Sequence, residues 1–140
     1  MHYRALFAAV AVAALSACKA SQGLMPDDCT PGQCRLKVKV GENCALEVLP
    51  EHLYVPPGDA VSILWMIDPP STDAHFDANG ISFKPGQNPD QQFDEKRPES
   101  GGKAFHWRDK NTLAGRFKYD VNVRDGQGRL CHLDPFIYNR

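Results

Sequence analysis

Hydrophobic and polar residues alternate with a period of two over several short segments of the chain. The clearest segment is 116–123, which reads RFKYDVNV and places an aromatic or aliphatic residue at every second position. Residues 36–40 follow the same rule, and so do residues 61–67, whose second face is only partly polar. This period is typical of β-strands, and the mixed second face predicts that 61–67 is a central strand.

The remaining pattern predicts an all-β fold. Turn sequences follow two of the strand patterns, PPGD at 56–59 and DGQG at 125–128. After the N-terminal segment, no stretch of ten or more residues keeps a helical period. Seven or eight short strands at this spacing predict one antiparallel Greek-key β-sandwich. The other candidate strands are residues 44–48, 81–83, 104–107 and 130–133.

Two segments fall outside the alternation. Residues 84–102 are polar, contain three prolines and a Gly-Gly pair, and are interrupted only by Phe93, which predicts a long loop. Loops of this length are usually functional or mobile, so we expect this one to contact a partner. The last residues, 133–140, are apolar enough to pack on the sandwich, with Phe136 and Ile137 buried and Arg140 solvated.

The N-terminus carries an export signal. Residues 1–4 are weakly basic, and residues 5–15 are apolar but shorter than the roughly 20 residues of a spanning helix, which indicates a signal peptide. The following Leu-Ser-Ala-Cys, ending at Cys18, resembles the lipobox of bacterial lipoproteins. This resemblance implies cleavage before Cys18, a diacylglycerol on its thiol and acylation of the new amino terminus. The alternative is an ordinary signal peptide with an incidental cysteine.

These features divide the chain into three parts. Residues 1–17 form the predicted lipoprotein signal peptide, residues 18–33 a polar tether rich in Pro and Gly, and residues 34–140 one β-sandwich domain. Lys19 follows the cysteine where an aspartate often marks inner-membrane retention in enteric bacteria. The expected location is therefore the periplasmic side of the outer membrane, reached through the lipid anchor.

Four cysteines remain for disulfide bonds. In an oxidising compartment we expect Cys29, Cys34, Cys44 and Cys131 to pair. Three pairings are possible and the sequence alone does not choose among them. We favour Cys44 with Cys131, which joins an early strand to a late one, and Cys29 with Cys34 across a short Pro-Gly turn. A zinc site is the competing interpretation, but it lacks a Cys-x-x-Cys knuckle.

Two segments resemble the cupredoxin family. Residues 57–65, PGDAVSILW, are similar to the strand entry of cupredoxins, and His75 follows where that family places its first copper-ligating histidine. Residues 115–121, GRFKYDV, resemble the strand that leads to the copper-binding cysteine, but Val121 stands at the cysteine position. The resemblance implies a cupredoxin-like sandwich without a blue copper site. Immunoglobulin-like domains share the same alternation, so both folds remain open.

Other metal chemistry has weaker support. His75, His106, His52 and Met66 could form a non-blue copper site, although a solvated loop histidine is the commoner role for His75. Residues 77–80, DANG, are similar to part of a calcium loop, but the flanking ligand positions hold His and Gly, so we predict a turn. We therefore predict no cofactor and no resident metal.

The sequence also argues against catalysis and nucleic-acid binding. It contains no Gly-x-Ser-x-Gly elbow and no glycine-rich phosphate motif. The net charge of −1 provides no large basic field. A basic stripe, Arg35, Lys37 and Lys39, is typical of an edge strand that lysines protect from pairing, and alternatively could meet an anionic partner.

Together these observations predict a lipid-anchored periplasmic protein that is not an enzyme and acts as a binding or assembly module for another envelope protein. Two alternatives remain. One is a copper-handling protein that uses the His and Met candidates. The other is an inhibitor that inserts a loop into the active cleft of a hydrolase.

Overall fold

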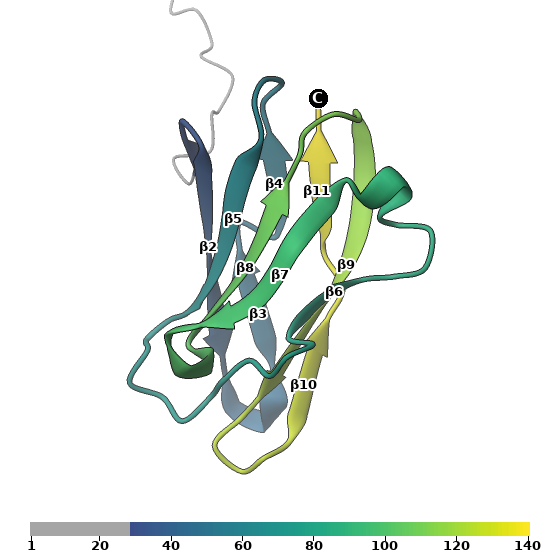
Figure 1. Ribbon diagram of the computed structural model, residues 1–140. Coiled ribbons are helices and arrows are strands. Elements are labelled where there is room, and N and C mark those ends of the chain that lie inside the picture. Colours follow the sequence, from purple (N-terminus) through teal and green to yellow (C-terminus); the bar gives the residue numbers. More distant parts are fainter. Residues whose placement is uncertain (1–28) are drawn as a thin grey trace, which may run out of the picture.

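Strands dominate the computed structural model, which describes residues 29–140 (Figure 1). The predicted signal peptide, Cys18 and residues 19–28 of the tether lie outside the described residues. The first sheet contains β1 (Cys29–Thr30), β2 (Gln33–Val40), β3 (Leu46–Leu49), β5 (Val61–Ile67), β7 (Phe93–Glu99) and β8 (Ala104–Asp109). The second contains β4 (His52–Val55), β6 (Ile81–Phe83), β9 (Gly115–Arg124), β10 (Leu130–Leu133) and β11 (Phe136–Asn139).

Helical structure in residues 29–140 is confined to three single turns. They are the 3-10 turns η1 (Glu42–Cys44), η2 (Pro89–Gln91) and η3 (Ser100–Gly102). Within this part of the chain, no helix has the length and apolar character to cross a membrane. The prediction of an all-β sandwich is therefore confirmed.

The two sheets are mixed, so the prediction of purely antiparallel pairing is wrong. The first sheet has the order β1-β2-β5-β8-β7 with β3 also on β2, and β2 runs parallel to β5. The second has the order β10-β9-β11-β4 with β6 on β9, and β11 runs parallel to β4. The parallel pairing of β2 with β5 arises because the chain changes sheets between β3 and β4. It then returns at β5 in the same direction as β2, after a connection long enough for a parallel neighbour.

β2 lies inside the first sheet and not at its edge. It pairs with β5 on one side and with β1 and β3 on the other. Arg35, Lys37 and Lys39 are exposed on its outer face, while Leu36 and Val38 are fully buried. The predicted role of the basic stripe as edge protection is therefore wrong, because alternation identifies the solvated face of a strand but not the number of its neighbours.

The core fills the space between the two sheets. At its centre Trp65 of β5 and Tyr119 of β9 are fully buried, with ring centroids 5.4 Å apart in an edge-on arrangement. The Trp65 Nε1–H donates to the Tyr119 hydroxyl at 3.1 Å. Burial raises the pKa of Tyr119 above its ordinary value, so the hydroxyl stays neutral. This bond ties the two sheets together while satisfying both polar groups of the aromatic pair.

The predicted long loop contains a strand. Residues 93–99 form β7, which pairs with β8 at the edge of the first sheet, so the loop prediction is wrong over this segment. Only Phe93 of this strand is buried. The register shifts between Asp94 and Arg97, and Glu95 adopts φ +56°. The shift breaks the two-residue alternation, which hides the strand in the sequence.

The first sheet begins at Cys29, so residues 29–33 of the predicted tether belong to the domain. β1 and the start of β2 form a hairpin that the Cys29–Cys34 disulfide closes. The second disulfide, Cys44–Cys131, connects η1 to β10. The favoured pairing of the four cysteines is confirmed. The first bond closes a local hairpin, and the second lies where the tertiary fold brings two distant segments together.

Candidate interaction surface

β9, β10 and β11 behave as one long hairpin. The register that pairs Leu130 with Arg124 continues unchanged to Phe136 opposite Lys118. Pro135 interrupts the strand, but its carbonyl oxygen still accepts a hydrogen bond from the Tyr119 N–H at 3.1 Å. β11 therefore lies between β9 and β4, and the outward-facing residues of these three strands share one face of the second sheet.

Four aromatic side chains form two opposed pairs on this outer face, His52 with Phe136 and Tyr54 with Tyr138. We term His52 and Tyr54 of β4, with Phe136 and Tyr138 of β11, the aromatic ladder. Tyr54 and Tyr138 stack with their centroids 4.8 Å apart and an interplanar angle of 18°. His52 and Phe136 lie 5.8 Å and 6.1 Å from the Tyr138 ring. Tyr54 is 38% exposed and the other three side chains are half-buried, so the ladder is partly accessible from solvent.

Three cations cover the ends of the ladder. The Arg116 guanidinium lies 4.6 Å from the centroid of the Phe136 ring, and the Lys118 ammonium lies 5.4 Å from the same centroid. The Arg140 guanidinium lies 5.2 Å from the Tyr54 centroid. Cation–π contacts of this kind hold a charge in place without neutralising it.

The C-terminal segment differs in part from expectation. Ile137 is fully buried and Arg140 is exposed, as predicted. Phe136 is only half-buried, and the prediction that it joins the core is wrong. The segment is a strand, so neighbouring residues point to opposite faces, and Phe136 and Tyr138 turn outward when Ile137 turns inward.

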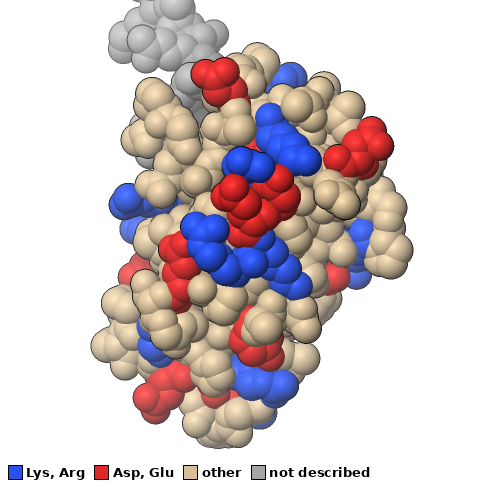
Figure 2. All heavy atoms as spheres, in the orientation of Figure 1, with Lys and Arg blue, Asp and Glu red and all other residues tan. Residues whose placement is uncertain are grey.

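Two of the three cations beside the ladder have no acidic partner within residues 29–140. Among residues 29–140, Lys118 pairs with Asp134 at 2.7 Å, whereas Arg116 and Arg140 form no ion pair. The front of the first sheet is different: Figure 2 shows Lys and Arg beside Asp and Glu over β7 and β8. There Arg108 contacts Asp94 at 2.6 Å, and this hydrogen bond lowers the pKa of the Asp94 carboxyl. The ladder face therefore carries positive charge that the described chain leaves unpaired.

Sequence reasoning missed the ladder. Its two strands are four residues each and lie far apart in the sequence, and the parallel pairing of β4 with β11 brings them together. The available signal was the pair of short alternations HLYV and FIYN. Each places aromatic residues on one face, but neither shows that the two faces coincide.

A buried polar network lies beneath the C-terminal end of the ladder. Asp109 of β8 is fully buried, and its Oδ1 accepts hydrogen bonds from Gln92 Nε2 at 2.9 Å, the Asn111 N–H at 2.7 Å and Asn139 Nδ2 at 3.1 Å. Its Oδ2 and the Oδ1 of Asn139 are buried without a protein partner. Burial raises the pKa of Asp109, which favours the protonated carboxyl. The network fixes β11 to β8 across the sandwich.

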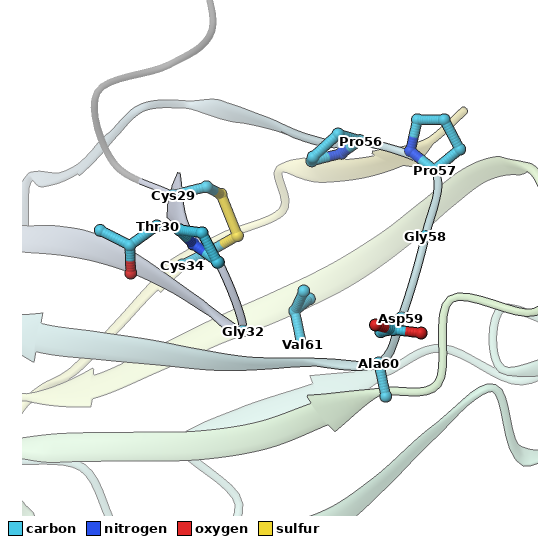
Figure 3. Close-up of a pocket in the computed structure, with 11 residues that line it drawn as sticks. Cys29, Thr30, Gly32, Cys34, Pro56, Pro57, Gly58, Asp59, Ala60 and Val61 are labelled. Carbon is cyan, nitrogen blue, oxygen red and sulfur yellow. A yellow bond between two sulfur atoms is a disulfide. The ribbon is translucent and has the colours of Figure 1, made fainter.

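An apolar pocket of about 290 Å³ lies beside the Cys29–Cys34 disulfide (Figure 3). Pro56, Pro57 and Val61 form part of its wall, and Asp59 is its one ionisable lining residue among those described. Asn111 Nδ2 donates to the Pro56 carbonyl oxygen at 2.9 Å and fixes this wall. The lining provides shape and apolar surface but no pair of groups for acid–base or nucleophilic chemistry.

The copper candidates do not meet at one place. His106 and Met66 lie on the first sheet, and His52 lies on the second. His106 Nδ1 is 3.1 Å from the Glu95 carbonyl oxygen and Nε2 is 3.2 Å from Ser62 Oγ, so both ring nitrogens have partners.

His75 lies on neither of these strands. It forms an isolated bridge with Arg124 at the end of β9. Residues 77–80 nearby form the predicted turn, in which the Asn79 N–H donates to Asp77 Oδ1 at 3.1 Å.

Within residues 29–140, one group of three His, Cys, Asp or Glu side chains is close enough to hold a metal ion: Cys44, Asp125 and Cys131. Its two cysteines are joined to each other in a disulfide, so their thiolates are consumed. The group therefore has only one ligand left to offer.

Neither the protein-family models nor the curated proteins compared with this sequence match it. The geometry of the molecule is therefore the basis for assigning a function. The aromatic ladder with its three cations is the surface feature that this geometry singles out.

Proposed function

We propose that the protein is a lipid-anchored envelope protein on the periplasmic side of the bacterial outer membrane and acts as a non-catalytic binding module. The lipobox-like sequence at Cys18 supports the anchor. The two disulfides support an oxidising compartment. We further propose a cupredoxin-like Greek-key arrangement that has lost the blue copper site, as the valine at position 121 suggests.

The observation that carries this proposal is the ladder face. Partly exposed aromatic rings flanked by arginines are typical of interaction surfaces, since Tyr and Arg are enriched among the residues that contribute most to binding. The ladder rests on strands that the core and the Asp109 network hold in position, so the surface is formed before a partner arrives.

A site-specific photo-crosslinking experiment in the intact cell envelope tests the proposal. A photoreactive amino acid at Tyr54 should give a discrete crosslinked species, and the same amino acid at Lys37, exposed on the first sheet, should not. In parallel, the wild-type protein should partition into the detergent phase and Cys18→Ala into the aqueous phase. Equal crosslinking at the two positions, or a water-soluble wild type, would count against the proposed function.

A further inference from the structure

The unpaired charges on the ladder face indicate the chemistry of the partner. Arg116 and Arg140 form no ion pair within residues 29–140, although both are exposed and both contact an aromatic ring. A guanidinium group presents its N–H donors in a planar fork that matches a carboxylate or a phosphate. The ladder face therefore favours an anionic partner.

The rings hold these guanidinium groups in position. Arg116 lies 4.6 Å from the Phe136 centroid and Arg140 lies 5.2 Å from the Tyr54 centroid. An arginine already held against a ring loses less side-chain entropy when it binds an anion. Arg116 contacts the Phe136 ring and Arg140 contacts the Tyr54 ring, so the two guanidinium groups offer a partner two points of contact for negative charge.

The arrangement of the rings favours a polypeptide over a glycan or a membrane. Tyr54 is stacked on Tyr138 and also contacts Arg140, so part of its ring surface is already engaged and less of it is left for stacking on a sugar. The ladder lies across two adjacent parallel strands of a sheet, and its charged neighbours Arg116 and Arg140 are exposed beside it. Alternating aromatic and basic groups fit an extended segment that carries both acidic and apolar side chains.

We propose that the ladder face binds an extended acidic segment of another envelope protein, whose carboxylates meet Arg116 and Arg140 on either side of the stacked rings. This inference rests on the proposed function, because it takes the ladder face as the binding surface. It adds the chemical class of the partner.

The test uses the mature acylated protein in micelles of a neutral detergent. Binding of a fluorescent oligoglutamate peptide is measured by anisotropy, with oligolysine and phosphatidylglycerol vesicles as competing probes. Arg116→Glu/Arg140→Glu should weaken oligoglutamate binding roughly tenfold or more, as expected for hot-spot residues. The comparison variant Lys37→Glu/Lys39→Glu makes the same change of net charge on the exposed basic stripe of β2, the competing surface for an anion. It should leave oligoglutamate binding within about twofold of the wild-type value.

Three results would overturn the inference. They are equal effects of the two double variants, preferential binding of the vesicles, and no binding of oligoglutamate at low salt. A neutral pair, Arg116→Gln/Arg140→Gln, with an unchanged melting temperature separates lost binding from lost folding. If Tyr54 still crosslinks to a partner in the envelope while oligoglutamate fails to bind, the proposed function stands and only the acidic chemistry is wrong.

Discussion

Loss of the Cys44–Cys131 disulfide should destabilise the domain far more than loss of Cys29–Cys34. The first bond joins residues 87 apart in sequence and the second joins residues 5 apart. In the loop-entropy model, a disulfide stabilises the fold by restricting the unfolded chain, and the effect grows with the logarithm of the loop length. At 25 °C the model gives about 4.6 kcal/mol for the long loop and about 2 kcal/mol for the short one.

The assay is urea denaturation followed by tryptophan fluorescence, since Trp65 lies in the core. The perturbation is Cys44→Ala/Cys131→Ala, and the matched control is Cys29→Ala/Cys34→Ala. Because small domains have a total stability of about 5–15 kcal/mol, the first variant should unfold at a much lower urea concentration or fail to fold at 37 °C. Equal losses of stability in the two variants would refute the entropic reasoning and would indicate that local packing dominates.

Two further predictions concern buried polar groups. Burial raises the folded-state pKa of Asp109 above that of the unfolded chain, so its contribution to stability is complete below the unfolded pKa of about 4 and is lost as pH rises through the folded pKa. The variant Asp109→Asn keeps an acceptor for Asn139 and has no carboxyl to titrate. We therefore expect its free energy of unfolding, relative to that of wild type, to increase as the pH rises from acidic to neutral. Urea denaturation measures this difference, and a difference that does not change with pH would contradict the prediction. Tyr119→Phe removes the acceptor of the buried Trp65 N–H and should cost about 1–3 kcal/mol in the same assay. The exposed-face control Tyr138→Phe should cost little, and similar losses for both tyrosines would contradict the assigned role of the Trp65 bond.

Local alternation predicted several strands closely. β5, β6 and β10 begin and end at the predicted residues 61–67, 81–83 and 130–133. Their buried positions follow the two-residue period because each strand has one face on the core. β7 was not predicted because it has no regular buried face. It lies at an edge of the sheet, buries one residue and contains a register shift.

The disulfide pairing could be predicted from the sequence only in part. Counting the four cysteines limited the choice to three pairings, and the Pro-Gly turn between Cys29 and Cys34 favoured the one that the structure contains. The pairing of Cys44 with Cys131 depends on how η1 meets β10 in space. The sequence around either cysteine does not indicate that contact.

The sequence by itself determined which residues face the core in most strands and that the fold is all-β. Only the tertiary structure decided that the sheets are mixed, that β2 is an interior strand, and that β4 and β11 place their aromatic residues on one face beside Arg116 and Arg140. The physical reason is that side-chain alternation depends on a few neighbouring residues, whereas strand partners depend on the path of the whole chain.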